Sequence, residues 1–220
     1  MDSVYADPMA YASHIDSSNR RLFLLPLYRL DECPAFETET AVCLGMFDGV
    51  HLGHRRLIEE TCRSAKEKHL LPCAFTFDIP PASVLRPDKT IRLLTNITEK
   101  SSIMHSLGLS HVVYTHFDES VSQLPAKVFF ESILVNKLRA KHIVVGFHYH
   151  FGKKAEGDTR MLQELCTLHG IGLTVVPPVT TPQGDLISST AIRTALNSGH
   201  QDLADVMLGP SPFVQPDNIN

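Results

Sequence analysis

One stretch of the sequence decides the fold, and it reads Ala41-Val42-Cys43-Leu44-Gly45-Met46-Phe47-Asp48-Gly49-Val50-His51-Leu52-Gly53-His54. Its apolar first half predicts a buried strand over residues 41–47, and Gly49 allows the backbone to turn sharply after it. A helix is expected to begin near Gly53, so its free N–H groups and its dipole favour an anion just beyond the strand. The stretch therefore predicts a phosphate site at the end of a strand.

The two histidines of this stretch carry its chemistry. His51 and His54 are three residues apart, so they share one face of the first helical turn. Gly53 removes the side chain that would block a phosphate there. Each imidazole can donate hydrogen bonds to oxygens that gain negative charge during phosphoryl transfer. The alternative is a surface loop that happens to contain His and Gly, and the position between strand and helix argues against it.

Composition sets the protein class. The chain has 220 residues, of which 43% are hydrophobic and 20% charged, as in ordinary globular proteins. A net charge of −4, without any block of Lys and Arg, argues against binding of nucleic acid. The five cysteines are scattered, which predicts buried free thiols in a reducing compartment. No apolar run is long enough to span a membrane, and a weak signal-peptide pattern is interrupted by Pro26 and Arg29, so we expect a cytoplasmic protein.

The rest of the chain alternates strands and helices, which predicts an α/β, Rossmann-like fold with a parallel sheet covered by helices on both faces. Residues 1–20 and 214–220 are expected to be loose tails around one domain, residues 21–213. Asn96 and Glu99 predict a capping box at the start of a helix that ends near Leu107. Strands are expected at residues 22–30 (a sheet edge), 41–47, 71–77, 111–115, 142–146 and 173–176. Helices are expected at residues 53–69, 96–107, 126–138, 158–169, 190–197 and 201–208.

In such sheets, ligands bind beyond the carboxyl ends of the strands. A second candidate for that edge is Ser188-Ser189-Thr190, followed one helical turn later by Arg193. Hydroxyl residues at a helix start can simply cap the helix. With free N–H groups and a guanidinium, they can also form a phosphate cradle. Pairing with the histidine turn favours the cradle.

Further motifs follow in a fixed order up to about residue 213. They are Phe75-Thr76-Phe77-Asp78, Leu94-Thr95 with Glu99-Lys100, Val144-Val145-Gly146 with Phe151-Gly152, Gly157-Asp158, Ser188-Ser189-Thr190 with Ile192-Arg193, and Leu208-Gly209. Together with Gly45–His54, this series resembles bacterial FAD synthetases, the FMN adenylyltransferase module of the bifunctional riboflavin kinase/FAD synthetases. The resemblance implies transfer of AMP from ATP to FMN, normally with Mg²⁺, and gives FAD and pyrophosphate by direct in-line attack.

The resemblance also implies roles for individual residues. His51, His54 and Arg193 would be catalytic, the histidines by holding the ATP phosphates and stabilising charge on the reacting phosphorus. The other residues expected to bind ATP are Gly45, Met46, Phe47, Asp48, Gly53, Ser188, Ser189 and Thr190. The residues expected to border the flavin are Phe77, Asp78, Pro80, Pro81, Gly146, His148 and Phe151.

Three departures from the family pattern stand out. His148 stands where the family usually has Asp or Asn. Because Mg²⁺ prefers oxygen ligands, we expect His148 to form a hydrogen bond and not to bind Mg²⁺. The alternative is that His148 and His150 together bind zinc or nickel. The family's Phe-x-Pro-His-Pro is Phe77-Asp78-Ile79-Pro80-Pro81 here, and Asp78 fits either a magnesium or ribose contact or a turn cap. No segment resembles the riboflavin kinase domain, so FMN is expected from a separate kinase or from another part of a longer protein.

Two other functions fit the same residues. The chemistry could be retained with another phosphorylated acceptor, because the flavin-side segments are where the chain departs from the family. Alternatively, the chain could be a catalytically weakened protein that binds flavin or nucleotide, as His148 suggests. The intact His51 and His54 pair and the Ser188–Arg193 segment favour the transferase.

Overall fold

The computed structural model describes residues 26–85 and 91–213. The expected tails, residues 1–20 and 214–220, and residues 22–25 of the expected first strand lie outside this part. Six strands form a single sheet in which every neighbouring pair is parallel, as predicted. In sheet order they are β1 (Leu27–Arg29), β4 (His111–Thr115), β3 (Leu71–Phe77), β2 (Thr40–Leu44), β5 (Ala140–Gly146) and β6 (Gly172–Val176).

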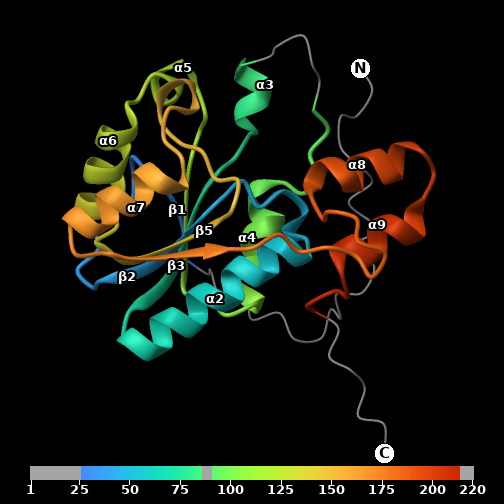
Figure 1. The fold of residues 1–220 in the computed structure, drawn as a ribbon, viewed down its shortest axis with the longest axis horizontal. Coiled ribbons are helices and arrows are strands. Elements are labelled where there is room, and N and C mark those ends of the chain that lie inside the picture. Colours follow the sequence, from blue (N-terminus) through green and yellow to red (C-terminus); the bar gives the residue numbers. More distant parts are fainter. Residues whose placement is uncertain (1–25, 86–90, 214–220) are drawn as a thin grey trace, which may run out of the picture.

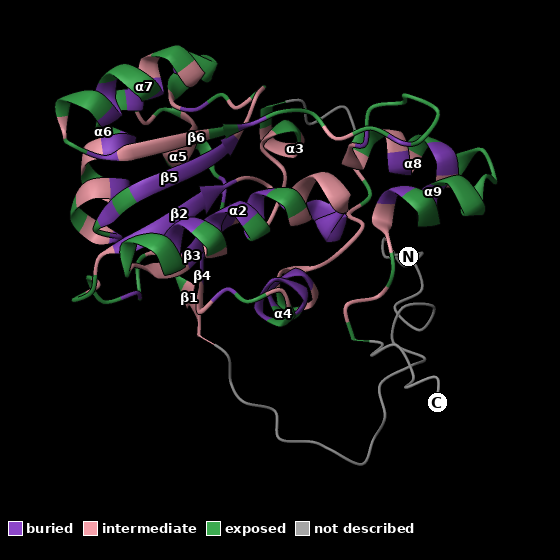
Figure 2. Ribbon diagram, turned by 60° about the horizontal axis from the view of Figure 1, so that its bottom comes forward, coloured by how far each residue is buried: buried purple, intermediate pink, exposed green. Residues whose placement is uncertain are grey.

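Helices cover both faces of the sheet (Figure 1), because alternate residues of the central strands face two separate apolar cores. In β2, Val42 and Leu44 join one core and Cys43 the other, and all five residues of the strand are buried. The first core packs against α6 (Ala126–Val128), η2 (Phe129–Lys137) and α7 (Thr159–Leu168). The second packs against α2 (Leu52–Lys68) and α4 (Ile97–Ser106). The buried strands and helix stripes are visible in Figure 2.

The last two helices, α8 (Ser189–Asn197) and α9 (Gln201–Leu208), form a hairpin beyond the carboxyl ends of the strands (Figure 1). They enclose a third apolar cluster, which includes Ile192 and Met207. The predicted capping box at Asn96 and Glu99 is confirmed. Short helices that were not predicted are η1 (Asp48–Val50), α3 (Pro81–Leu85), α5 (Glu119–Ser122) and η3 (Lys153–Ala155).

Two predicted elements need correction. The strand expected over residues 41–47 ends at Leu44, because Phe47 adopts a φ of 51° that no strand accommodates. The regular helix expected over residues 126–138 is α6 followed by the π-helix η2, with Leu138 N–H donating to the carbonyl of Ile133 at 2.9 Å. This wider winding places Phe129, Phe130 and Leu134 together in the core. Within the described ranges, no helix is both long and apolar enough to cross a membrane.

Candidate active site

The turn between β2 and α2 is built from strained backbone. Phe47, Gly49 and Val50 all have positive φ, at 51°, 78° and 39°, and only glycine adopts such values without cost. The side chains of Phe47 and Val50 are fully buried in the core, which holds the turn in this shape. Strain kept at the end of a central strand is typical of functional sites.

His51 and His54 lie face to face at the start of α2. Their ring centroids are 3.7 Å apart with the planes 21° from parallel, and the His54 ring also packs 5.1 Å from that of Phe47. His51 caps the helix, since its Nδ1 accepts from the backbone N–H of His54 at 3.4 Å, which leaves Nε2 as the donor atom of a neutral ring. Gly53 suits this packing, because a Cβ there would lie only 3.1 Å from two atoms of the His51 ring, which is tighter than an ordinary contact.

Both histidines are neutral near pH 7. Burial lowers the pKa of His51 to about 4, and the charges of Arg193 and Arg55 add to the effect. The pKa of His54 lies well below its usual value, again through burial first and then through His51 and Lys100. Among the described residues, none forms a hydrogen bond with the buried Nδ1 of His54. The pair therefore offers neutral hydrogen-bonding groups to a ligand.

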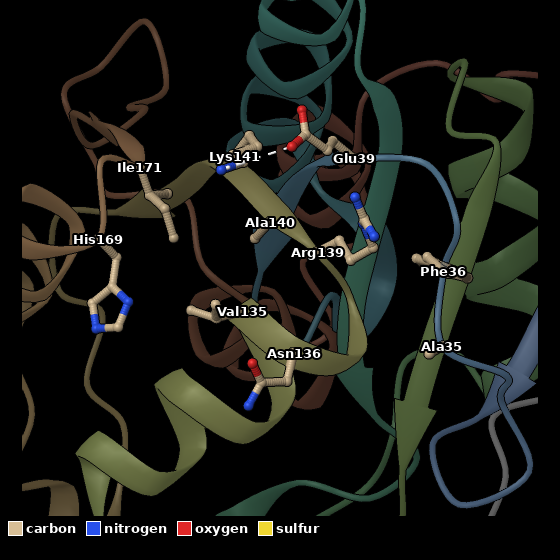
Figure 3. Close-up of a pocket in the computed structure, with 10 residues that line it drawn as sticks. All are labelled: Ala35, Phe36, Glu39, Val135, Asn136, Arg139, Ala140, Lys141, His169 and Ile171. Atoms are coloured by element: carbon tan, nitrogen blue, oxygen red, sulfur yellow. Dashed lines mark ion pairs between the residues drawn. The ribbon is translucent and has the colours of Figure 1, made fainter.

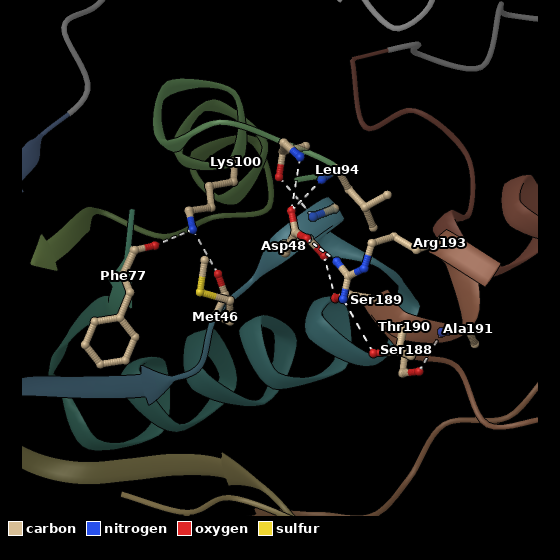
Figure 4. Close-up of polar contacts among 12 residues, drawn as sticks. Met46, Asp48, Phe77, Leu94, Lys100, Ser188, Ser189, Thr190, Ala191 and Arg193 are labelled. Atoms are coloured by element: carbon tan, nitrogen blue, oxygen red, sulfur yellow. Dashed lines mark hydrogen bonds and ion pairs between the residues drawn. The ribbon is translucent and has the colours of Figure 1, made fainter. Parts of the chain in front are cut away.

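Asp48 joins the histidine turn to two distant parts of the chain (Figure 4). Its Oδ1 accepts from the backbone N–H groups of Leu94 at 2.8 Å and Thr95 at 3.1 Å. Its Oδ2 accepts from Nη1 of Arg193 at 2.6 Å, in an ion pair whose side chains are 2% and 23% exposed. Ser189 Oγ donates to the backbone carbonyl of Asp48 at 2.9 Å. The start of α8 is thereby fixed against the histidine turn.

The hydroxyl groups at the start of α8 already have partners in the structure. Ser188 caps the helix, its Oγ accepting from the N–H of Ala191 at 3.1 Å, and Thr190 Oγ1 accepts from Arg193 Nη2 at 3.4 Å. The capping interpretation is therefore correct for Ser188. A phosphate cradle formed by these residues stays a prediction.

The predicted flavin side lies at the ends of β3 and β4 and after β5. Asp78 Oδ1 accepts from the N–H of Ile79 at 2.7 Å, as a turn cap would, and Oδ2 accepts from Nδ1 of His116 at 2.8 Å. His116 follows β4 and is not among the residues predicted to border the flavin, so the sequence did not reveal this hydrogen bond. Phe77 precedes Asp78 in the sequence, and Phe117 follows His116. The rings of these two phenylalanines meet edge to face, with centroids 5.1 Å apart.

The other flavin-side residues differ in exposure. Gly146 ends β5, and a Cβ there would meet no atom within 4 Å. His148 is exposed, with its ring centroid 3.8 Å from that of Phe147. Phe151 belongs to the core, at 6% exposure, where it packs against Tyr149 and Phe129. The Pro80 carbonyl accepts from Ser83 N–H at 2.9 Å, and Pro81 starts α3.

Sequence reasoning missed the importance of Lys100. This side chain is fully buried on α4, and its Nζ donates to the carbonyl of Met46 at 2.9 Å and to that of Phe77 at 2.6 Å (Figure 4). Burial lowers the pKa of Lys100 to about 8, against the opposing effect of Asp48 and Asp78. A signal was present, because Lys100 occupies the same helical stripe as the apolar Ile103 and Met104.

A pocket of 340 Å³ lies at the opposite edge of the sheet (Figure 3). Glu39, Arg139 and Lys141, at the amino ends of β2 and β5, contribute to its lining. It contains none of the predicted site residues. In the part of the chain that the structure describes, no three His, Cys, Asp or Glu side chains gather in a way that could hold a metal ion.

Comparisons with known proteins identify the family of the chain. A family model described as FAD synthetase matches residues 33–191. The bifunctional riboflavin kinase/FMN adenylyltransferase of Bacillus subtilis is 34% identical over 181 residues, which cover 81% of this chain and 56% of that protein. The FAD synthetase of Listeria monocytogenes is 35% identical over 167 residues, covering 76% of this chain and 67% of that protein. The chain thus spans a little over half the length of the first of these relatives.

Solved structures show the same fold. A protein from Streptococcus pneumoniae, described as a macrolide-efflux protein, superposes with a TM-score of 0.73 at 27% identity, covering 84% of this chain and 62% of that one. A pantoate-β-alanine ligase from Francisella tularensis, solved with an ATP analogue and β-alanine, matches with a TM-score of 0.51 at 12% identity, covering 89% of this chain and 82% of that one. The second likeness supports the predicted α/β, Rossmann-like fold.

Proposed function

Because the chain belongs to the FAD synthetase family, we propose that it transfers AMP from ATP to FMN and releases FAD and pyrophosphate. The observation that carries this proposal is the network of Asp48, which brings Arg193 and the start of α8 against the turn that bears His51 and His54. Two groups of phosphate-binding residue types, far apart in sequence, thereby lie at one edge of the sheet.

The reaction needs positioning more than covalent chemistry. An oxygen of the FMN phosphate attacks the α-phosphorus of ATP, and a new P–O bond forms as the bond to the β-phosphate oxygen breaks. The electron pair of that bond leaves with pyrophosphate. In this scheme, His51 and His54 donate hydrogen bonds to the α-phosphate as its negative charge grows. Their neutral state suits them to donate without gaining or losing a proton.

The remaining residues would divide between the two substrates. Gly45, Met46 and Phe47 would lie near the adenosine, and Ser188, Ser189 and Arg193 would hold the leaving phosphates beside Asp48. Thr190 and Gly53 would complete the ATP side. The acceptor side would be formed at Phe77, Asp78, Pro80 and Pro81 and after Gly146, with His148 facing solvent until FMN binds and Phe151 supporting the loop from the core.

The described residues do not form a dedicated magnesium site. Both oxygens of Asp48 already accept hydrogen bonds, and Asp78 is paired with Ile79 and His116. Mg²⁺ commonly reaches nucleotide sites mainly through substrate phosphates. We therefore assign no step to a protein-bound metal, and any Mg²⁺ would be bound chiefly by ATP.

The cellular setting belongs to the same proposal. All five cysteines are free thiols, as expected in the reducing cytoplasm. FMN would be supplied by a riboflavin kinase, an activity that the name of the Bacillus subtilis relative joins to FMN adenylyltransferase. ATP and FMN are then the two partners of this site.

The test is incubation of the purified chain with ATP, Mg²⁺ and FMN, followed by chromatography for FAD and an assay for pyrophosphate. A variant with both His51→Ala and His54→Ala, purified in parallel, controls for contaminating enzymes. FAD formation by the parent alone supports the proposal. Nicotinate mononucleotide and phosphopantetheine, offered in place of FMN, test other acceptors. Tight FMN binding without FAD would indicate a binding protein instead.

A further inference from the structure

Lys100 holds an ammonium group inside the protein without a carboxylate partner. Its side chain is fully buried, and within the described ranges no Asp or Glu lies at ion-pair distance from Nζ. The group instead donates to two backbone carbonyls, those of Met46 and Phe77. Burying a charge in this way is costly, and an apolar residue of similar size usually packs at less cost. A lysine kept here is therefore expected to serve the site.

The two carbonyls belong to the two sides of the proposed reaction. Met46 lies in the loop after β2 that leads to the histidine turn, whereas Phe77 ends β3 beside Asp78. Pairing between these strands stops at Leu44 and Phe75, followed by one further contact from Gly45 N–H to the Phe75 carbonyl at 3.3 Å. Beyond that point, Lys100 bridges the strand ends, together with Thr76 Oγ1, which donates to the Met46 carbonyl at 3.0 Å.

We propose that Lys100 is a positioning residue for adenylyl transfer, whose ammonium fixes the loop at Met46 relative to the segment at Phe77 and places a positive charge behind His54. The proposal rests on the proposed function and deepens it. A reaction between two bound substrates is sensitive to their separation, and a displacement of about 1 Å can cost roughly 100-fold in rate.

Three titratable groups interact electrostatically with this ammonium, namely Asp48, Asp78 and His54. Asp48 and Asp78 favour its charged form, and the charge in turn helps to keep the His54 ring neutral. Since burial lowers the pKa of Lys100 to about 8, the ammonium is almost fully charged at pH 7 and below, and it loses its charge as the pH rises through 8. The loop at Met46 should therefore be held less firmly to the segment at Phe77 at alkaline pH, when Lys100 has lost its charge.

The test compares Lys100→Met with Thr76→Val. Both variants remove a donor to the Met46 carbonyl, but only Lys100→Met removes the charge and the short bond of 2.6 Å to the Phe77 carbonyl, from which Thr76 Oγ1 lies 3.5 Å away. Met nearly conserves volume, and Thr76 remains to satisfy the carbonyl of Met46, so Lys100→Met should fold. We expect kcat for FAD formation to fall about 100-fold in Lys100→Met and less than about 5-fold in Thr76→Val. Melting curves of both variants report stability separately.

Two further readouts separate positioning from simple support of the fold. The parent and Thr76→Val should lose activity as the pH rises past about 8, whereas the residual activity of Lys100→Met should lack that decline. In NMR titrations without substrate, the pKa of His54 should be higher in Lys100→Met than in the parent.

Equal losses of kcat in the two variants, or an unchanged His54 pKa, would overturn the role of Lys100. If Lys100→Met does not fold, the test is the pH dependence of FAD formation by the parent protein. A rate that stays constant as the pH rises above 8 would then refute the inference. Absence of FAD from the parent protein would instead refute the proposed function, and the substrate-free NMR result would still report on Lys100.

Discussion

The loops after β2 and β5 lie at the same edge of the sheet but are built differently. The loop after β2 contains two buried polar residues, Asp48 and His51, and each forms a hydrogen bond within the protein. The buried Lys100 of α4 donates a further hydrogen bond to this loop, at the Met46 carbonyl. After β5, His148 and His150 are exposed, and no described residue forms a hydrogen bond with the His148 side chain. The loop after β2 is thus organised before any ligand binds, whereas the side chains of His148 and His150 after β5 are open to solvent. Preorganised donors lower reaction barriers most, so substitutions after β2 should have the larger effects.

The largest effect is expected for His54→Ala. Loss of one preorganised donor should reduce the rate of FAD formation by about 100-fold or more. The ring also packs against Phe47 and His51, so the melting temperature should fall by a few degrees (about 1 kcal/mol). Turnover measured beside a melting curve checks both effects. Near-normal turnover in the folded variant would show that His54 takes no part in the reaction. It would also contradict the expectation that substitutions after β2 have larger effects than those after β5.

Arg193→Ala should weaken ATP binding more than FMN binding. Loss of a charged donor should raise the dissociation constant for ATP about 30-fold and leave that for FMN within about 3-fold. The change also leaves the Asp48 carboxylate buried without its cation, so stability should fall. The double variant Asp48→Asn/Arg193→Ala is the control, because it should recover stability but not ATP affinity. Calorimetry measures the dissociation constant for each ligand. Equal losses of affinity for ATP and for FMN would show that Arg193 does not belong to the nucleotide side.

The burial of His51 should make the fold sensitive to acid. Burial holds the pKa of His51 to about 4, whereas an unfolded histidine takes up its proton near pH 6.5. The unfolded chain therefore binds more protons between these values, and stability falls as the pH drops from 6.5 to 4, by on the order of 3 kcal/mol. We expect the melting temperature of His51→Asn to fall less than that of the parent over this range. Parallel slopes would show that His51 is not buried as described.

The smallest effect is expected for His148→Asn. Asn can replace a single neutral hydrogen bond to the flavin or its phosphate, so FMN affinity should change less than about 5-fold and ATP affinity not measurably. Fluorescence titration of FMN measures the first, and calorimetry the second. A loss approaching that of His54→Ala would mean that the loop after β5 is as organised as the one after β2.

The fold was predictable because the central strands contain segments buried on both faces, such as Ile143–Val145 of β5, which read as short apolar runs. The same property hid the end of β2, since Gly45, Met46 and Phe47 continue the run while the backbone already turns. The π-helix η2 was missed because residues at helical spacing fit either winding.

The site was predictable where its residues are close in sequence, as at His51 and His54. Contacts between distant segments were not, and the pair of His116 with Asp78 is an example. A single His at the end of a strand, like a single Lys on a helix, usually faces water, and only its neighbours in space show otherwise.

The ion pair between Asp48 and Arg193 also has a consequence for how the protein is made. The two residues are 145 positions apart in the sequence. Strand β2 also pairs with β5, which is synthesised later. At ordinary rates of translation, Asp48 is added to the chain roughly 7 to 30 seconds before Arg193. During that time its carboxylate stays hydrated, and nothing docks the start of α8 onto the strained turn. A growing chain can therefore assemble much of its sheet while its nucleotide side is still incomplete.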